Sequence, residues 1–338
     1  MKKILPFVAI MLFTFCSHKH PNTKHFEYLK LAGYAQGTTY HITYENSVNR
    51  NLGKQVDSIL KAFDLSLSEY IPNSIISRIN ANDPTAKTDT LFNTIFQKSK
   101  IVHDNTGGAF DITVGPLVDA WGFGPKGHKF PRKGQIDTLL QYVGMEKVKI
   151  VNNKVIKKFP QTNIDVNAIA QGFSVDVVCH YFDSLGIKNY IVEIGGELRA
   201  KGKNAKDNNW RVGIDSPIDG NSHPGEDIQK ILHITDKAMA TSGNYRKYYE
   251  ENGVKYAHHI DPHTGYPAKQ TILSITLISN ECAMSDGFAT GCIVVGLKKT
   301  KEFLKKHPEF DAYIIYSDNK GQFCEFMTEG VKKMIANN

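Results

Sequence analysis

Residues 240–245 and 256–267 read ATSGNY and YAHHIDPHTGYP. Both segments lie beside apolar runs that are typical of strands, and they crowd polar side chains, turn residues and a pair of histidines together. Loops held by a rigid scaffold are where proteins usually present their chemistry. The same residues also suit a surface hairpin fixed by its Asp-Pro and Thr-Gly turns, and spacing alone does not separate the two interpretations.

Outside these segments, helix-like and strand-like patterns alternate. Apolar residues at helical spacing predict helices over about 48–66, 91–105, 170–185 and 281–296. Runs rich in β-branched and aromatic residues predict strands at 37–44, 147–151, 155–158, 190–194, 198–200, 210–214, 274–278, 311–316 and 322–326. We expect 190–194, 198–200 and 210–214 to be neighbours in one antiparallel sheet, and 68–80 to be an ordered loop. The pattern predicts an α+β fold.

The composition is that of a soluble globular protein. Of 338 residues, 41% are hydrophobic and 22% are charged, which allows a large core. No repeat, low-complexity tract or long linker marks a boundary, so we expect one elaborated catalytic domain with antiparallel sheets and packed helices. The formal net charge is +7 without a basic block, which favours a small anionic substrate over nucleic acid.

The first 16 residues predict an export leader. Lys2 and Lys3 precede an apolar run from Ile4 to Phe15, and Cys16 follows directly. The run is shorter than the roughly 20 residues that a membrane-spanning helix needs. Cys16 resembles the lipidation site of bacterial lipoproteins, and a plain signal peptide cut elsewhere is the alternative. We therefore expect a leader at 1–16, a polar tether at 17–30 and the catalytic domain at 31–338.

The other cysteines do not indicate a metal or redox site. Cys282 and Cys292 lie in an apolar stretch, and Cys179 and Cys324 stand alone. None forms a C-x-x-C pair, so zinc and redox chemistry are unsupported and a buried, unpaired thiol is expected for each.

Three further segments combine polar residues with small ones. Residues 109–117 place glycine near Asp111, which suits either a flat ligand or a tightly packed turn. Asp165 stands where a strand meets a helix, as a helix cap or beside amides that hold a phosphate. Asp286 and Thr290 share one helical face, which suits an ion or phosphate site or an ordinary capped helix. Gly195-Gly196 is no phosphate loop, because neither phosphate-loop motif is present.

Five segments, in order along the chain, resemble the bacterial FAD:protein FMN transferases (ApbE family), once described as thiamine-biosynthesis lipoproteins. Each segment is weak alone, whereas the ordered set is specific and spans most of the chain. The segments are 77–80 (SRIN), 110–117 (FDITVGPL), 165–172 (DVNAIAQG), 240–245 together with 259–267, and 286–290 (DGFAT).

The resemblance implies an ApbE-like, T-fold-like domain that transfers FMN from FAD to a Thr or Ser hydroxyl of an acceptor protein and releases AMP. It implies that Mg²⁺ is required and that the ligands are the Asp286 carboxylate, the Thr290 hydroxyl and the Ala168 backbone carbonyl. Oxygen ligands of this kind suit a hard cation that acts on a pyrophosphate.

The same resemblance implies a catalytic base and an FAD site. His259 would accept the proton of the acceptor hydroxyl, with a histidine that only fixes the Asp-Pro turn as the alternative. Tyr70 and Phe110 would offer flat apolar surface to an aromatic ring. The residues expected to line the FAD site are Gln36, Tyr70, Ala109, Phe110, Asp111, Asp165, Gln171 and Ile260. The chain departs from the usual family residues at Gln36, Asn167, Gln171, Asn244 and His263.

Two other functions stay open at this point. One is an FAD pyrophosphatase that gives FMN and AMP, with water in place of the acceptor hydroxyl. The other is a non-catalytic FAD-binding lipoprotein. The expected partners are FAD, an exported acceptor flavoprotein and, through a lipid on Cys16, the periplasmic face of the inner membrane, with no nucleic acid.

Overall fold

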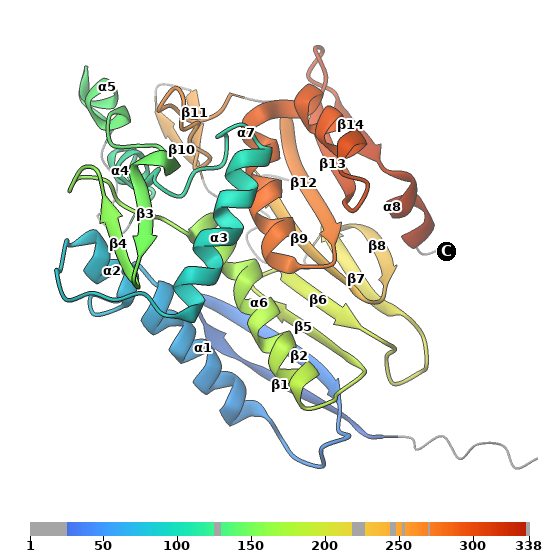
Figure 1. Cartoon of the computed structure of the whole chain (residues 1–338). Coiled ribbons are helices and arrows are strands. Elements are labelled where there is room, and N and C mark those ends of the chain that lie inside the picture. Colours follow the sequence, from blue (N-terminus) through green and yellow to red (C-terminus); the bar gives the residue numbers. More distant parts are fainter. Residues whose placement is uncertain are drawn as a thin grey trace, which may run out of the picture.

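One antiparallel sheet organises the computed structural model, which describes residues 26–124, 130–217, 227–243, 248–251, 254–269 and 271–335 (Figure 1). Within these residues the sheet has eight strands, and neighbouring strands are antiparallel. It joins segments from both ends of the chain. In spatial order the strands are β1 (Tyr28–Ala35), β2 (Thr38–Glu45), β5 (Tyr190–Ile194), β6 (Glu197–Lys201), β9 (Lys237–Gly243), β12 (Ile272–Ser279), β13 (Asp311–Ser317) and β14 (Phe323–Met327).

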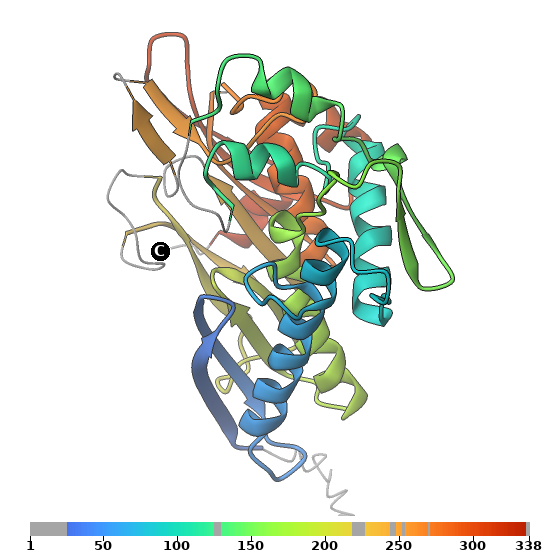
Figure 2. The ribbon, with the colours of Figure 1, turned by 90° about the vertical axis from the view of Figure 1, so that its left-hand side faces the viewer.

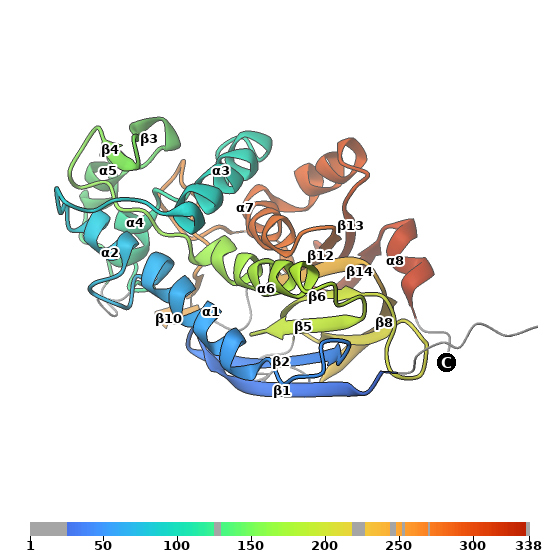
Figure 3. The same ribbon diagram turned by 60° about the horizontal axis from the view of Figure 1, so that its bottom comes forward.

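The longer helices cover one face of this sheet, so that strands and helices form separate layers (Figure 2). In Figure 3, α6 and α7 lie side by side over the sheet, and α3 lies outside them. The apolar stripe of each helix explains this arrangement; α1, for example, buries Val56, Leu60, Phe63 and Leu67 at helical spacing. These helices are α1 (Gly53–Leu67), α3 (Thr90–Asn105), α6 (Asn167–Ser184) and α7 (Cys282–Lys306).

A two-stranded ribbon and a short helix pack on the opposite face. Leu198 and Ala200 of β6 point into this second core, whereas Arg199 between them points toward α6. This alternation is the period of a strand whose two faces are both covered. The covering elements are β7 (Trp210–Asp215), β8 (Ile228–Ile234) and α8 (Glu329–Met334).

The remaining short elements lie at the end of the molecule where the candidate site forms. Some of them pack around a separate small core of Leu117, Trp121, Ile136, Val143 and Ile260, whereas others add residues such as Ile76, Met145 and Val148 to the main core. The elements are α2 (Ile75–Asn80), α4 (Gly115–Ala120), α5 (Gln135–Leu140), the 3-10 turn η1 (Met145–Lys147), β3 (Val148–Val151), β4 (Lys154–Lys157), β10 (Tyr248–Glu251) and β11 (Val254–Ala257).

The α+β expectation is confirmed, and so are most of the expected elements, with four differences. The expected pairing of 190–194 with 198–200 is correct, but β7 pairs with β8 instead of joining that sheet. The expected loop 68–80 contains α2, which Ser74 caps by accepting the Ser77 amide at 3.1 Å. Strand β1 was not expected, and it begins inside the predicted tether. Helix α7 continues to residue 306 through a break at Gly296. None of the described helices is long and apolar enough to span a bilayer.

A glycine lets α6 and α7 approach each other closely. A Cβ atom on Gly172 would lie 2.5 Å from the Cys282 carbonyl oxygen and 2.8 Å from the Asp286 Cβ. Both distances are shorter than normal contacts, and the first involves backbone, which cannot rotate away. The helix crossing therefore requires glycine at this position.

We expect Gly172→Ala to lower the free energy of unfolding, because the added methyl group forces the two helices apart. Overpacking of this kind costs about 1–3 kcal/mol, which outweighs the gain of about 1 kcal/mol from replacing glycine in a helix. Urea unfolding measures the change. Gly53→Ala at the start of α1 is the matched control, since its nearest neighbours lie at 3.1 and 3.6 Å. Equal stability changes in both variants would contradict the prediction.

Candidate functional site

A buried carboxylate lies where α6 and α7 cross. The Asp286 side chain on α7 is 7% exposed, and its Oδ2 accepts the Gly172 amide of α6 at 3.0 Å. Burial raises the pKa of this carboxyl to about 7, the Gly172 hydrogen bond opposes the rise, and the nearby Asp176 adds to it. No Lys, Arg or His of the described residues forms an ion pair with it.

The other two predicted metal ligands belong to the same helix crossing. Ala168 is in the first turn of α6, and regular helix geometry directs its carbonyl toward the amide of Gly172. That amide also contacts Asp286, so both oxygens approach one N–H group. Thr290 lies one turn beyond Asp286 on α7, and its Oγ1 is 3.3 Å from the Ser242 hydroxyl of β9. Asp286 and the start of α6 are thus in contact, and Thr290 lies one turn further along α7, beside β9.

These oxygens can bind a cation only if water or substrate completes its coordination. Among the described residues, no cluster of three or more His, Cys, Asp or Glu side chains is suited to a metal. The three predicted ligands comprise one carboxylate, one hydroxyl and one carbonyl, which is a set for a hard cation that keeps other positions for water or substrate. A buried carboxylate without a positive partner fits such an ion, because an isolated buried charge is costly.

His259 lies in a closed loop between β11 and β12. Its carbonyl accepts the Ala268 amide at 2.8 Å, and Ile260 bridges to Pro267. The side chain is 5% exposed, and burial, followed by the charge of His258, holds its pKa well below the ordinary value. The imidazole is therefore neutral at pH 7. Residues 259–268 form a hairpin, which is the geometry of the alternative interpretation. This geometry does not exclude chemistry at His259.

The loop that contains His259 contacts a second predicted segment. A Cβ on Gly108 would lie 3.1 Å from Nε2 of His263, and a Cβ on Gly291 of α7 would lie 2.6 Å from Cγ2 of Thr106. The segment from Thr106 to Gly108 therefore connects α7 with the histidine loop. Residues 106–108 follow α3 and precede the 110–117 motif segment, so the histidine loop, this turn and α7 meet here.

Gln36 and Gln171 meet through a shared serine. Gln36 and Gly37 have positive φ angles of 55° and 74°, as the two-residue turn between β1 and β2 requires. The Gln36 Oε1 accepts from the Ser174 hydroxyl at 3.0 Å, and the same hydroxyl lies 2.8 Å from the Gln171 carbonyl. Gln171 Nε2 donates to the Ile194 carbonyl at 3.1 Å. Both glutamines thus lie between α6 and the sheet.

Residues 109–111 differ from the expected ligand surface. The Phe110 ring, which is expected to offer a flat apolar surface, is 3% exposed and belongs to the main core. Ala109 is also buried. The Asp111 carboxylate accepts the Thr113 amide at 2.7 Å and the Met145 amide at 3.0 Å. In this structure the segment forms a tightly packed turn.

Asp165 and Tyr70 lie near the start of α6. The Asp165 Oδ1 accepts the Asn167 amide at 2.8 Å from the position before Val166, the N-cap of α6, and burial raises the pKa of the Asp165 carboxyl. Tyr70 is 64% exposed. Partial burial, followed by the charges of Asp165 and Glu69, raises the pKa of the Tyr70 hydroxyl. Of the two expected aromatic surfaces, Tyr70 alone is available to solvent.

Two polar residues of this region were missed from sequence. Ser242 lies in the 240–245 segment, and the sequence predicts no role for it. Asp176 is 1% exposed and contacts the start of α7. The available signal was a charged residue inside the apolar run 173–178, since a buried charge is normally paired.

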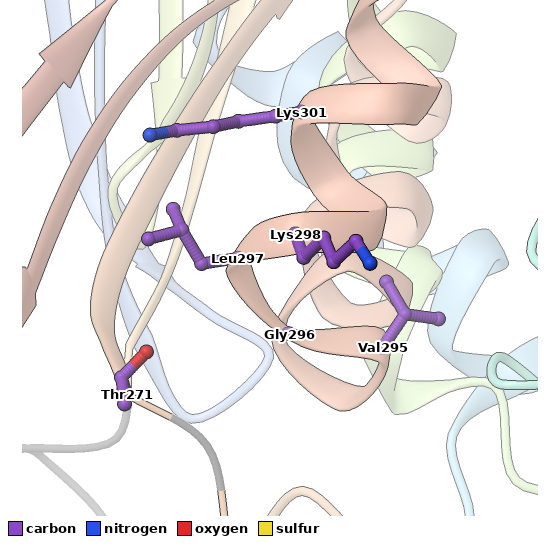
Figure 4. Close-up of a pocket in the computed structure, with 6 residues that line it drawn as sticks. All are labelled: Thr271, Val295, Gly296, Leu297, Lys298 and Lys301. Carbon is purple, nitrogen blue, oxygen red and sulfur yellow. The ribbon is translucent and has the colours of Figure 1, made fainter.

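Two surface hollows of the described residues lie away from the helix crossing. Neither contains a predicted site residue, so neither identifies the site. The larger, of about 490 Å³ (Figure 4), is lined by Thr271, Val295, Gly296, Leu297, Lys298 and Lys301. The other, of about 350 Å³, is lined by Ile79, Asn82, Asp83, Pro84, Ala86, Lys154, Val155, Ile156, Lys157 and Pro160. Cys16 and Asn244 lie outside the described residues.

We expect the metal-free protein to lose stability between pH 4 and pH 7 through Asp286. Its folded pKa of about 7 lies above the unfolded value, so the folded state binds the proton more tightly and the stabilisation disappears as pH rises. One pKa unit corresponds to about 1.4 kcal/mol, and the total loss is on the order of 4 kcal/mol.

Urea unfolding of the wild type and of Asp286→Asn, in EDTA from pH 4 to pH 8, measures this effect as the difference between the two proteins. Asp104→Asn, at an exposed aspartate of α3, is the matched control. If the difference in free energy of unfolding between wild type and Asp286→Asn stays constant with pH, the raised pKa assigned to Asp286 is wrong.

Comparisons with known proteins show the family to which the chain is similar. A model of the ApbE family matches residues 36–314. The FAD:protein FMN transferase of Haemophilus influenzae is 35% identical over 305 residues, which are 86% of this chain and 87% of that protein. The protein of the same name from Vibrio cholerae is 38% identical over 281 residues, which are 80% and 82% of the two chains.

Solved structures show the same fold. The flavin transferase ApbE from Vibrio cholerae matches with a TM-score of 0.81 at 33% identity and covers 91% of this chain and 99% of that one. The apo form of the flavinyl transferase ApbE from Pseudomonas stutzeri matches with a TM-score of 0.81 at 27% identity, over 93% and 98%. From the helix crossing, the histidine loop and these matches together, the chain belongs to the ApbE family.

Proposed function

We propose that this protein is an FAD:protein FMN transferase that is Mg²⁺-dependent, modifies a Thr or Ser hydroxyl and releases AMP. The carrying observation is the buried Asp286 carboxylate, which lies at the α6–α7 crossing and has no positive partner among the described residues. The names of relatives that match most of the chain support the same transfer.

Asp286, Thr290 and the Ala168 carbonyl would hold the magnesium ion. Bound there, Mg²⁺ would neutralise charge on the pyrophosphate of FAD and polarise a phosphate oxygen. The chain's contribution is to keep one carboxylate ready in a buried site. The approach of α6, which requires Gly172, keeps the carboxylate close to the start of that helix.

The reaction replaces one phosphorus–oxygen bond by another. The acceptor hydroxyl oxygen attacks the phosphorus of the FMN half, the bond from that phosphorus to the bridging oxygen breaks, and AMP leaves with the electron pair. In this proposal His259 takes the hydroxyl proton. Its lowered pKa leaves the imidazole neutral at pH 7, which is the protonation state that a base needs before it takes a proton.

The FAD site in this proposal surrounds that centre. Exposed Tyr70 would stack on an aromatic ring, and Gln36 and Gln171 would contact the ligand by exchanging the bonds they make to Ser174 and Ile194. The buried residues would shape the site through packing and backbone. They are Ala109, Phe110, Asp111, Asp165 and Ile260.

Incubation with FAD and Mg²⁺, with and without candidate exported flavoproteins, tests the function by mass spectrometry. An FMN adduct on Thr or Ser, with one AMP released per adduct, is expected. Rapid release of FMN and AMP without acceptor would favour a pyrophosphatase. Tight FAD binding without any product in either condition would favour a non-catalytic flavin-binding protein.

Two variants separate the roles within this reaction. We expect Asp286→Ala to reduce transfer about a thousandfold or more, since a metal contributes several kcal/mol to such a transition state. His259→Ala should slow transfer by about 10²–10⁴-fold and retain FAD binding. Transfer rates and FAD fluorescence titration measure the two effects, with Asp104→Ala as control. Wild-type transfer rates in either variant would remove the role assigned to that residue.

We also propose export and lipid anchoring through Cys16, which the leader pattern supports. The full-length protein should fractionate with the inner membrane, and Cys16→Ala should appear in the soluble periplasmic fraction. Fractionation and mass spectrometry of the mature N-terminus measure this. A wild-type N-terminus cut elsewhere and lacking lipid would instead indicate a plain signal peptide.

A further inference from the structure

A carboxylate of α6 caps the start of α7. The first amides of a helix have no partner within it, and the N-cap residue of α7, Glu281, makes no side-chain cap. The Asp176 side chain provides the missing acceptors: Oδ1 accepts the Cys282 amide at 3.0 Å and Oδ2 accepts the Ala283 amide at 2.9 Å. The helix start is therefore held by a residue more than 100 positions earlier.

The same carboxylate is tied to the sheet. Asp176 is 1% exposed, and Arg199 of β6 lies 3.2 Å from its Oδ1. A buried charge tolerates displacement poorly, because it then loses the partners that offset its desolvation. Asp176 thus joins α6, α7 and the sheet at one point.

This point lies beside the proposed metal site on both helices. Asp286 is four residues after Cys282 on α7, and Gly172 is four residues before Asp176 on α6. Each interval is about one helical turn, or about 6 Å. The two helices are therefore joined at two points one turn apart, by Asp176 to the α7 amides and by Asp286 to the Gly172 amide. Two such points fix both rotation and sliding of α7.

We propose that Asp176 is a positioning residue that sets the place of Asp286 and Thr290 against the start of α6, and thereby the affinity for Mg²⁺. The inference rests on the proposed function for its metal, whereas the capping geometry stands independently of it. Residues that orient metal ligands in this way typically change metal affinity by about 10–100-fold when they are altered.

The chain contains a matched control. Asp183 is on the same helix and pairs with Lys201 of β6 at 2.7 Å, as Asp176 pairs with Arg199, and it also accepts from the Tyr190 hydroxyl. Among the described residues, the Asp183 carboxylate contacts Tyr190 of β5 and Lys201 of β6 and no amide of α7. Asp183→Asn therefore removes an α6–β6 ion pair without removing a cap of α7.

The experiment compares the full-length wild type, Asp176→Asn and Asp183→Asn by two measurements. Hydrogen exchange with mass spectrometry, in EDTA, reports on residues 282–290 and on 297–306. Thermal unfolding during a Mg²⁺ titration, with and without FAD, gives the midpoint concentration for stabilisation. We expect Asp176→Asn to exchange about tenfold faster over 282–290 but not over 297–306, and to raise the Mg²⁺ midpoint by about tenfold or more. Asp183→Asn should change neither.

Several results would overturn the proposed role of Asp176. Wild-type exchange at 282–290 in a folded Asp176→Asn protein, or equal changes in both variants, would overturn the inference. Faster exchange with an unchanged Mg²⁺ midpoint would also overturn it. If Mg²⁺ does not stabilise the wild type with or without FAD, the metal assignment fails. Hydrogen exchange over 282–290 then tests only whether Asp176 positions the start of α7. If Asp176→Asn does not fold, Asp176→Glu replaces it, because it keeps the charge but moves the carboxylate by one methylene.

Discussion

The crossing of α6 and α7 depends on two carboxylates that act in opposite directions. Asp176 of α6 accepts amides at the start of α7, and Asp286 of α7 accepts an amide of α6. The absence of a side chain at Gly172 permits the approach. Hydrogen bonds to charged acceptors are stronger than neutral ones, and burial makes them costly to break. The sheet and the outer helices support this contact.

The electrostatics of the site follow from burial. Desolvation raises the pKa of Asp286 to about 7 and lowers the pKa of His259. Near pH 7 the Asp286 carboxyl is therefore partly protonated, and the His259 imidazole is neutral. In the proposed function, a cation at Asp286 and an uncharged base at His259 are therefore electrostatically compatible. Asp165 and Asp111 are buried as well, but amides of their own neighbourhood satisfy them, so they shape the site instead.

Much of the fold was accessible to pattern reasoning. The apolar spacing of α1, α3, α6 and α7 and the β-branched runs of β2, β5, β12 and β13 identify these elements, because their apolar residues pack in continuous cores. The pairing of β7 was not accessible. A strand's pattern specifies that it has a buried face but not which partner covers it, and β7 covers the sheet instead of extending it.

By itself, the sequence singled out Asp286, Thr290 and His259 as candidates, because its motif segments resemble those of the ApbE family in their order and residues. Only the tertiary structure decided what surrounds them. It buried the Phe110 ring, used Asp111 within a turn, and brought Asp176 to the start of a helix that lies more than 100 residues later. Burial and long-range hydrogen bonds depend on how the helices and the sheet pack. The local spacing of residues does not predict that packing.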